Sequence, residues 1–306
     1  MTRTYPPCLT VLIAALAVAT AGCGGGQGGT AAADGPLQVV ATMSVFADFA
    51  EAVGGDLVTV DTLVPIGGDP HTYEPTPADS AAITDADVVI DNGLGLSPWF
   101  DTLAGNVEGE LVILTDGIAA EAVADAGEID PHMWMVPDYV DRGYLVAIQD
   151  AFATADPDNA DTYAANADAY RDTLAALDAE LTEEIARIPA DNRKLVTSHD
   201  AYSYFAAAYG LEVSGSVVGV TTEEEPSARA IADLIDVIRA KGVPTIFVES
   251  TVNPGLIQQV ARDAGVEVGA PLYGDSVGEA GSGAEDYAGM MRANVSAIVA
   301  GLGGND

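Results

Sequence analysis

Cysteine is almost absent from this chain of 306 residues. The two cysteines, Cys8 and Cys23, both lie within the first 23 residues. The rest of the sequence therefore has no partner for a disulfide bond and no thiolate that could bind a metal. Any metal site beyond Cys23 has to be built from nitrogen and oxygen ligands.

Basic side chains are also scarce. Eleven lysines and arginines stand against 47 aspartates and glutamates, which gives a formal net charge of −36. Such a surface repels the phosphates of DNA and RNA, so we expect no nucleic-acid partner. It attracts cations only weakly and without specificity. The simplest interpretation of this charge is a solvated surface suited to salty surroundings, and the charge alone predicts no binding site.

Long apolar runs are missing, and the nearest to one is at the N-terminus. In residues 1–23, MTRTYPPCLTVLIAALAVATAGC, one arginine precedes an apolar run that is short for a bilayer span. This is the pattern of a secretory signal. Residues 20–23, TAGC, resemble a bacterial lipobox, in which the cysteine is acylated, although Thr20 departs from the usual leucine or valine. Cys23 is therefore the predicted lipidation site. The alternative is a plain signal peptide with an incidental cysteine.

The segment that follows Cys23 is rich in glycine and has nothing to bury. It is typical of a flexible tether that holds a domain away from a membrane. We assign residues 1–22 to a lipoprotein signal peptide and residues 23–36 to the tether. The predicted location is extracytoplasmic, with the exported protein held at the bacterial cell membrane by its lipid anchor only.

From residue 37 onwards, apolar segments rich in β-formers alternate with amphipathic helical segments. LQVVATM reads as a strand, for example, and the helical segment VFADFAEAVGG after it ends at a glycine. The same alternation returns in the last third of the chain. Strands that alternate with helices predict parallel β-α-β units and an α/β fold. We find no sequence repeat between the two halves.

Residues 158–188 interrupt this alternation. They contain no glycine or proline, and apolar side chains recur in steps of three and four from Tyr163 to Ile188. This spacing marks one face of a continuous helix, which at 1.5 Å per residue is roughly 45 Å long. We predict two parallel-sheet lobes, residues 37–157 and 189–306, joined by one long rigid helix. The alternative is a long surface helix within a single domain.

The sequence has only three histidines, His71, His132 and His199. Each lies in a loop or turn, at the end of an apolar run or beside a proline. Ligands of α/β folds bind where such loops converge, at the carboxyl ends of strands. Since two histidines precede the long helix and one follows it, a shared site lies between the lobes. A lone loop histidine is more often structural, but three in equivalent positions favour a zinc, nickel or copper site.

A carboxylate is the expected fourth ligand. The best candidate is Asp275 in PLYGDSVG, just after an apolar run, although one aspartate among so many acids means little by composition alone. Glu249, at the end of PTIFVES, is the second candidate. Its alternative role is to accept a hydrogen bond from a ligand histidine and orient that ring, or to cap a helix.

Several segments resemble the zinc/manganese solute-binding proteins of bacterial ABC transporters, the cluster A-I family. They include GDPHTYEPTPAD, DPHMW, SHDAYSYFAAAYG and IFVES, and in this order and spacing they are highly specific. The resemblance covers residues 37–302 and implies two small lobes joined by a rigid helix. It also implies a membrane permease and its cytoplasmic ATPase as partners of a monomeric binding protein. The metal ligands that it implies are His71, His132, His199 and Asp275.

The ligand set bears on the choice of metal. Three imidazoles and one carboxylate form a nitrogen-rich set that suits tetrahedral zinc. Manganese-selective relatives often have a carboxylate in place of His199, so Zn²⁺ is the expected cargo, with Mn²⁺ second and iron third. Many zinc-specific relatives carry a histidine-rich loop before the second ligand. In this chain the corresponding residues, 119–132, are acidic and have no histidine other than His132 itself.

Two other functions compete with metal transport. One is a zinc hydrolase with Glu249 or Asp275 as general base, but the sequence has no HExxH helix. The other is a surface adhesin or structural lipoprotein that binds metal incidentally. We expect a transport component that captures and releases a divalent metal and is not an enzyme.

Overall fold

The computed structural model describes residues 1–2 and 35–303, except 123, 126–127 and 224. Cys23 and nearly all of the predicted signal peptide and tether lie outside the described residues. Among the helices of the described part, none has both the length and the apolar character that crossing a bilayer requires.

Four parallel strands form the first sheet, in the order β2-β1-β3-β4. The two central strands, β1 (Leu37–Ala41) and β3 (Val88–Asp91), are almost entirely buried, as expected for strands covered on both faces. The edge strands β2 (Val58–Thr62) and β4 (Glu110–Ile113) are more exposed. Helix α1 (Ser44–Gly54) follows β1 and buries its apolar face, including Phe46 and Phe49. We call this part of the molecule the N-terminal lobe.

Three helices of this lobe were not predicted from the sequence. Helix α2 (Pro77–Asp85) buries only Ile83, so its sequence has no apolar stripe to reveal it. Its start is nevertheless well specified, because Thr76 and Asp79 form a capping box ahead of Pro77. The other two are α3 (Pro137–Tyr139) and α4 (Leu145–Ala155), joined by a π-helical turn. A two-residue antiparallel pair, β5 (Ala124–Asp125) and β6 (Glu128–Ile129), completes the lobe.

The C-terminal lobe is built on two parallel strand pairs. β7 (Lys194–Thr197) pairs with β8 (Glu212–Ser216), and β9 (Thr245–Ile246) pairs with β10 (Glu267–Val268). A single parallel bridge from Thr197 to Phe247 connects the pairs, giving the order β8-β7-β9-β10. In both lobes the strands are therefore arranged as the second, first, third and fourth along the chain, although the two halves share no visible sequence repeat. The helices of this lobe are α6 (Ser203–Tyr209), α7 (Ala228–Lys241), α8 (Pro254–Ala264) and α9 (Tyr287–Leu302).

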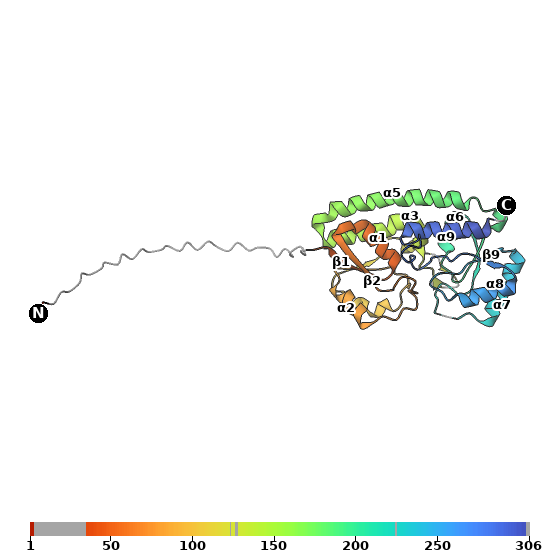
Figure 1. Cartoon of the computed structure of the whole chain (residues 1–306), viewed down its shortest axis with the longest axis horizontal. Helices are drawn as coiled ribbons and strands as arrows, with labels where there is room; N and C mark the ends of the chain where they lie inside the picture. Colours follow the sequence, from red (N-terminus) through yellow and green to blue (C-terminus); the bar gives the residue numbers. More distant parts are fainter. Residues whose placement is uncertain (3–34, 123, 126–127, 224, 304–306) are drawn as a thin grey trace. The chain divides into compact units, whose positions relative to one another are not determined.

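Helix α5 (Ala160–Ile185) is the predicted long helix, with 26 residues. It begins two residues later than predicted because Pro157–Asn159 forms a 3₁₀ turn. It ends three residues earlier than predicted, at Ile185. Pro189 disfavours a helical conformation at the residue before it, Ile188. Figure 1 shows α5 running along both lobes, and it contacts α1 and α4 in the first lobe and α6 and α9 in the second. The predicted α/β fold, with two parallel-sheet lobes and a linking helix, is confirmed.

One hydrophobic core continues from lobe to lobe beneath α5. It contains Phe49 of α1, Leu177 of α5 and Tyr287 of α9. The rings of Phe49 and Tyr287 meet edge to face, with 5.0 Å between their centroids. Because close-packed interiors resist deformation, this shared core holds the lobes together and limits motion between them.

Asp48 lies at the junction of this core and offers a test of its energetics. Its Oδ2 atom accepts the backbone N–H of Tyr287 at 3.0 Å and the hydroxyl of Tyr170 at 3.2 Å. Burial of the carboxyl group is the main reason why the pKa of Asp48 is raised to about 6. The hydrogen bonds from Tyr287 and Tyr170 lower this pKa but do not offset the effect of burial. Since the pKa in the folded protein lies above the unfolded value of 3.8, stability falls as pH rises from about 4 to 6.

We therefore predict that Asp48→Asn stabilises the protein at pH 8 by on the order of 1 kcal/mol and has little effect at pH 4. Denaturant unfolding in EDTA at both pH values measures the difference. The exposed Asp56→Asn is the matched control. A variant that is less stable than wild type at pH 8 contradicts the prediction.

Candidate metal centre

The three histidines and Asp275 come from four separate segments of the chain. His71 lies in the loop between β2 and α2, and His132 directly precedes a 3₁₀ turn. His199 follows β7 by two residues, and Asp275 lies in the loop that leads to α9. All four are buried, each with at most 2% of its surface exposed. The structure thus brings together in one place the four ligands that sequence analysis predicted.

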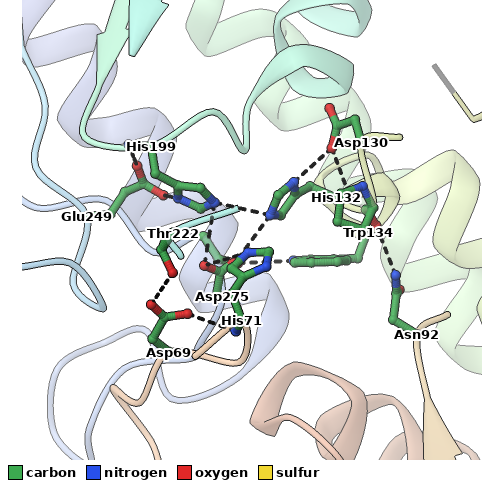
Figure 2. Close-up of polar contacts among 12 residues, drawn as sticks. Asp69, His71, Asn92, Asp130, His132, Trp134, His199, Thr222, Glu249 and Asp275 are labelled. Carbon is green, nitrogen blue, oxygen red and sulfur yellow. Dashed lines mark hydrogen bonds and ion pairs between the residues drawn. The ribbon is translucent and has the colours of Figure 1, made fainter. Parts of the chain in front are cut away.

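Figure 2 shows the three imidazole rings and the carboxylate turned toward a common centre. The Nε2 atoms of His132 and His199 are 3.2 Å apart. The Asp275 oxygens lie 3.5 Å from Nε2 of His132, 3.8 Å from that of His199 and 4.0 Å from that of His71. One ligand atom from each of the four residues lies within 4.8 Å of all the others.

These distances fit a metal ion. A tetrahedral zinc ion bound at about 2.0 Å has its ligand atoms about 3.3 Å apart. The His132–His199 distance already has this value, the Asp275 distances of 3.5, 3.8 and 4.0 Å exceed it by less than an ångström, and no other separation exceeds 4.8 Å. Small movements of side chains therefore suffice to close four ligands around one ion.

Several polar atoms of the centre have no hydrogen-bond partner among the described residues. They are both ring nitrogens of His71 and both carboxylate oxygens of Asp275. Leaving a buried polar group unpaired costs about 1–3 kcal/mol, and more for a charged group. A divalent cation is the ligand that satisfies a carboxylate and an imidazole nitrogen together. The centre therefore has the chemistry of a cation site and is poorly satisfied without one.

Carboxylates orient two of the three rings. Asp130 Oδ1 accepts both the backbone N–H of His132, at 2.9 Å, and a hydrogen bond from its Nδ1, at 2.8 Å. Glu249 holds His199 in the same way, with 2.8 Å to the backbone nitrogen and 2.7 Å to Nδ1. A neutral ring that donates from Nδ1 presents its Nε2 lone pair to the metal. Glu249 thus lies where it can orient the ring of His199, which is the alternative role that we gave it. It is not one of the four residues whose ligand atoms converge.

The role of Asp130 was missed by sequence analysis, although a signal was present. The tripeptide Asp-Pro-His occurs twice, as residues 69–71 and 130–132. In both copies the aspartate accepts the backbone N–H of its histidine at 2.9 Å. The second oxygen of Asp69 accepts the hydroxyl of Thr222, which belongs to the C-terminal lobe. Residue 222 is too far along the chain for any sequence pattern to suggest this contact.

Further hydrogen bonds fix the Asp275 loop against the N-terminal lobe. The indole N–H of Trp134 donates to the carbonyl of Gly274 at 3.0 Å, and the ring of Trp134 also packs beside His132. Ser276 accepts the backbone N–H of Gly67 at 2.8 Å. A side chain at position 274 would collide with Glu249, since a Cβ there would lie 2.7 Å from Oε2. Only glycine therefore lets this loop approach the carboxylate that holds His199.

Burial and neighbouring charges set the protonation of the centre. Burial is the main cause that lowers the pKa of His71 to about 2 and that of His132 well below its usual range. Burial also opposes a charge on His199, but the Glu249 and Asp275 carboxylates outweigh it and raise the pKa of His199 to about 10. Burial raises the pKa of Asp275 to about 7. A metal that binds His199 therefore has to displace a proton from the ring.

A two-lobed α/β fold with a rigid linking helix and a buried metal-type centre between the lobes defines a class, the extracytoplasmic substrate-binding proteins of metal transporters. The sequence matches the ZnuA family, described as zinc-uptake complex component A, periplasmic, over residues 39–301. The chain belongs to this family.

The relatives agree with this assignment. The manganese-binding lipoprotein MntA of Halalkalibacterium halodurans is 36% identical over 96% of this chain and 98% of its own length. The manganese ABC transporter substrate-binding lipoprotein PsaA of Streptococcus pneumoniae is 33% identical over 87% and 89%. The structure of the periplasmic zinc-binding protein TroA from Treponema pallidum superposes with a TM-score of 0.84 at 29% identity, covering 88% of this chain and 99% of that one.

Several predictions are confirmed by these comparisons. The chain is the substrate-binding component of a metal ABC importer and works with a permease and an ATPase. It is extracytoplasmic and membrane-anchored, and it is not an enzyme, so the hydrolase alternative is wrong. The cargo is a divalent metal, either zinc or manganese.

The Asp275 carboxylate, which accepts no hydrogen bond from the described residues, leads to a prediction with two opposite signs. Asp275→Asn removes a buried negative charge, so at pH 8 the metal-free variant should be more stable than metal-free wild type by on the order of 1 kcal/mol. Zinc at 100 times its dissociation constant should stabilise wild type by about 2.7 kcal/mol, and the same zinc concentration should stabilise the variant much less. Thermal unfolding with EDTA and with zinc measures both effects. A metal-free variant that unfolds below wild type disagrees with this account.

Proposed function

We propose that this protein captures Zn²⁺ between its lobes, with His71, His132, His199 and Asp275 as ligands, and delivers it to its permease. The observation that carries this proposal is the buried cluster of three imidazoles and one carboxylate, several of whose polar atoms have no hydrogen-bond partner among the described residues. Asp130 and Glu249 serve as positioning residues, because each fixes the orientation of one ligand ring.

Zinc is preferred because of the type and number of ligands. Three neutral nitrogens and one carboxylate oxygen match the tetrahedral coordination of zinc. Manganese and iron favour more oxygen ligands and a larger coordination number, including water. The four side chains are at most 2% exposed, so the centre leaves little room for additional water ligands.

Manganese is the second candidate, because two relatives that match most of this chain are named for manganese. Affinity in solution does not separate the two metals, since zinc outbinds manganese at almost any nitrogen-rich site. Cargo depends on which ion the protein meets and on which loaded form the permease accepts. The decisive measurement is therefore transport in cells.

The metal would bridge the lobes. His71 and His132 belong to the N-terminal lobe, whereas His199 and Asp275 belong to the C-terminal lobe. Because the shared core and α5 restrict hinge motion, we expect loading to shift loops and tilt the lobes slightly. The permease would then read this small change as the loaded state.

Three further proposals concern the rest of the chain. Residues 37–157 and 189–306 are the two lobes and residues 158–188 the segment that joins them. Cys23 carries the acyl anchor after removal of residues 1–22, and residues 23–36 form the tether. The protein acts as a monomer, since one chain supplies all four ligands.

Uptake in cells tests the cargo. A strain that lacks this gene should accumulate less zinc than its parent at low external zinc, while its manganese content is unchanged. The wild-type gene should restore zinc uptake, and His199→Ala should not, because the loss of one ligand of four weakens binding by about 100-fold or more. Elemental analysis of washed cells is the measurement. The control is Asp56→Asn, which alters an exposed acid. Restoration of manganese alone would identify manganese as the cargo.

A further inference from the structure

The two Asp-Pro-His segments fix their histidines to different extents. In each segment the aspartate accepts the backbone N–H of the histidine at 2.9 Å. Asp130 also holds the ring of His132 through Nδ1. Asp69 does not hold the ring of His71, because its other oxygen accepts the hydroxyl of Thr222. Among the described residues, neither nitrogen of the His71 ring has a hydrogen-bond partner.

The chain around each ligand shows the same difference. Residues 130–136 are all buried around His132, and residues 274–278 are all buried around Asp275. Residues 195–198, which lead to His199, are buried as well. By contrast, residues 65–67 before His71 and Thr72 after it are exposed, so that only Pro70, whose carbonyl accepts the indole N–H of Trp99 at 2.7 Å, is buried beside His71. Exposed segments with few buried contacts open at a lower free-energy cost than buried ones.

The other three ligands are fixed to one another. Asp130 and Glu249 fix the rings of His132 and His199. Trp134 packs on His132 and donates its indole N–H to Gly274, next to Asp275. These contacts therefore hold the rings of His132 and His199 and the backbone beside Asp275 in place before any metal arrives, as the 3.2 Å separation of the two Nε2 atoms indicates.

We infer that His132, His199 and Asp275 form a preformed three-ligand capture site, and that His71 binds the metal last and leaves first. Asp69 is a positioning residue for His71 that acts through the backbone alone. Its contact with Thr222 also links the position of His71 to the C-terminal lobe. This inference rests on the proposed metal-binding function and assigns an order to its steps.

The order has a kinetic consequence. If the three-ligand site captures the ion, the association rate depends on His132, His199 and Asp275 and is independent of His71. His71 completes the coordination afterwards, so its loss appears in the dissociation rate, where most differences in affinity between related sites arise. A ligand that leaves first also gives the permease a place at which to begin removing the metal.

Stopped-flow mixing of metal-free protein with Zn²⁺ tests this order, with the fluorescence of Trp134 beside His132 as the signal. We expect His71→Ala to associate with zinc within about threefold of the wild-type rate and to release it about 100-fold faster. The matched variants His132→Ala and His199→Ala should associate at least about tenfold more slowly. Equal slowing of association in all three variants overturns the inference. Absence of zinc binding by wild type would instead overturn the proposed function.

A second measurement needs no variant. The amides of His71, His132 and His199 each donate to a carboxylate, at 2.9, 2.9 and 2.8 Å, so they form a matched set. In metal-free wild type, hydrogen exchange should be fastest at His71, and zinc should increase protection most at that amide. Protection of His71 equal to that of His132 before zinc is added contradicts the inference.

Discussion

The structure depends on a buried carboxylate at the junction of the two lobes. Asp275 is fully buried, and neither of its oxygens has a hydrogen-bond partner among the described residues. Three imidazoles surround it, and hydrogen bonds from the N-terminal lobe hold its loop in place. Such an arrangement is unfavourable on its own and becomes favourable when a divalent cation enters. The fold thus maintains a local instability that metal binding relieves.

The surrounding architecture explains how this instability is tolerated. The core that continues from α1 through α5 to α9 buries many apolar side chains, and their burial stabilises the fold around the centre. It also restricts the lobes, so the four ligands cannot relax by moving apart. Orienting carboxylates add a further constraint, since Asp130 and Glu249 fix two rings with Nε2 directed at the centre. Asp69 contacts His71 through the backbone alone, because its other oxygen accepts the hydroxyl of Thr222.

The acidic surface and the centre have different physical roles. A formal charge of −36 attracts cations from solution without selecting among them. Selection requires dehydration and a fixed set of ligands, and within the described part of the chain the buried centre offers both. The two lobes have the same strand order, and each supplies two of the four residues that converge at the centre. Because loops at the carboxyl ends of parallel strands converge, two such lobes place their ligand loops opposite one another.

The sequence by itself determined the alternation of strands and helices and the long helix, and it singled out the three histidines and Asp275, which the structure brings together. These features follow from periodicity, from rare residue types and from motifs that resemble a known family, all of which are local in the chain. Helix α2 was missed because it buries only Ile83 and shows no apolar stripe. Only the tertiary structure decided that Asp130 and Glu249 orient rings and that Thr222 reaches Asp69. Except for Asp130, these contacts join residues at least 50 positions apart, and their geometry depends on how the lobes pack, which no local pattern records.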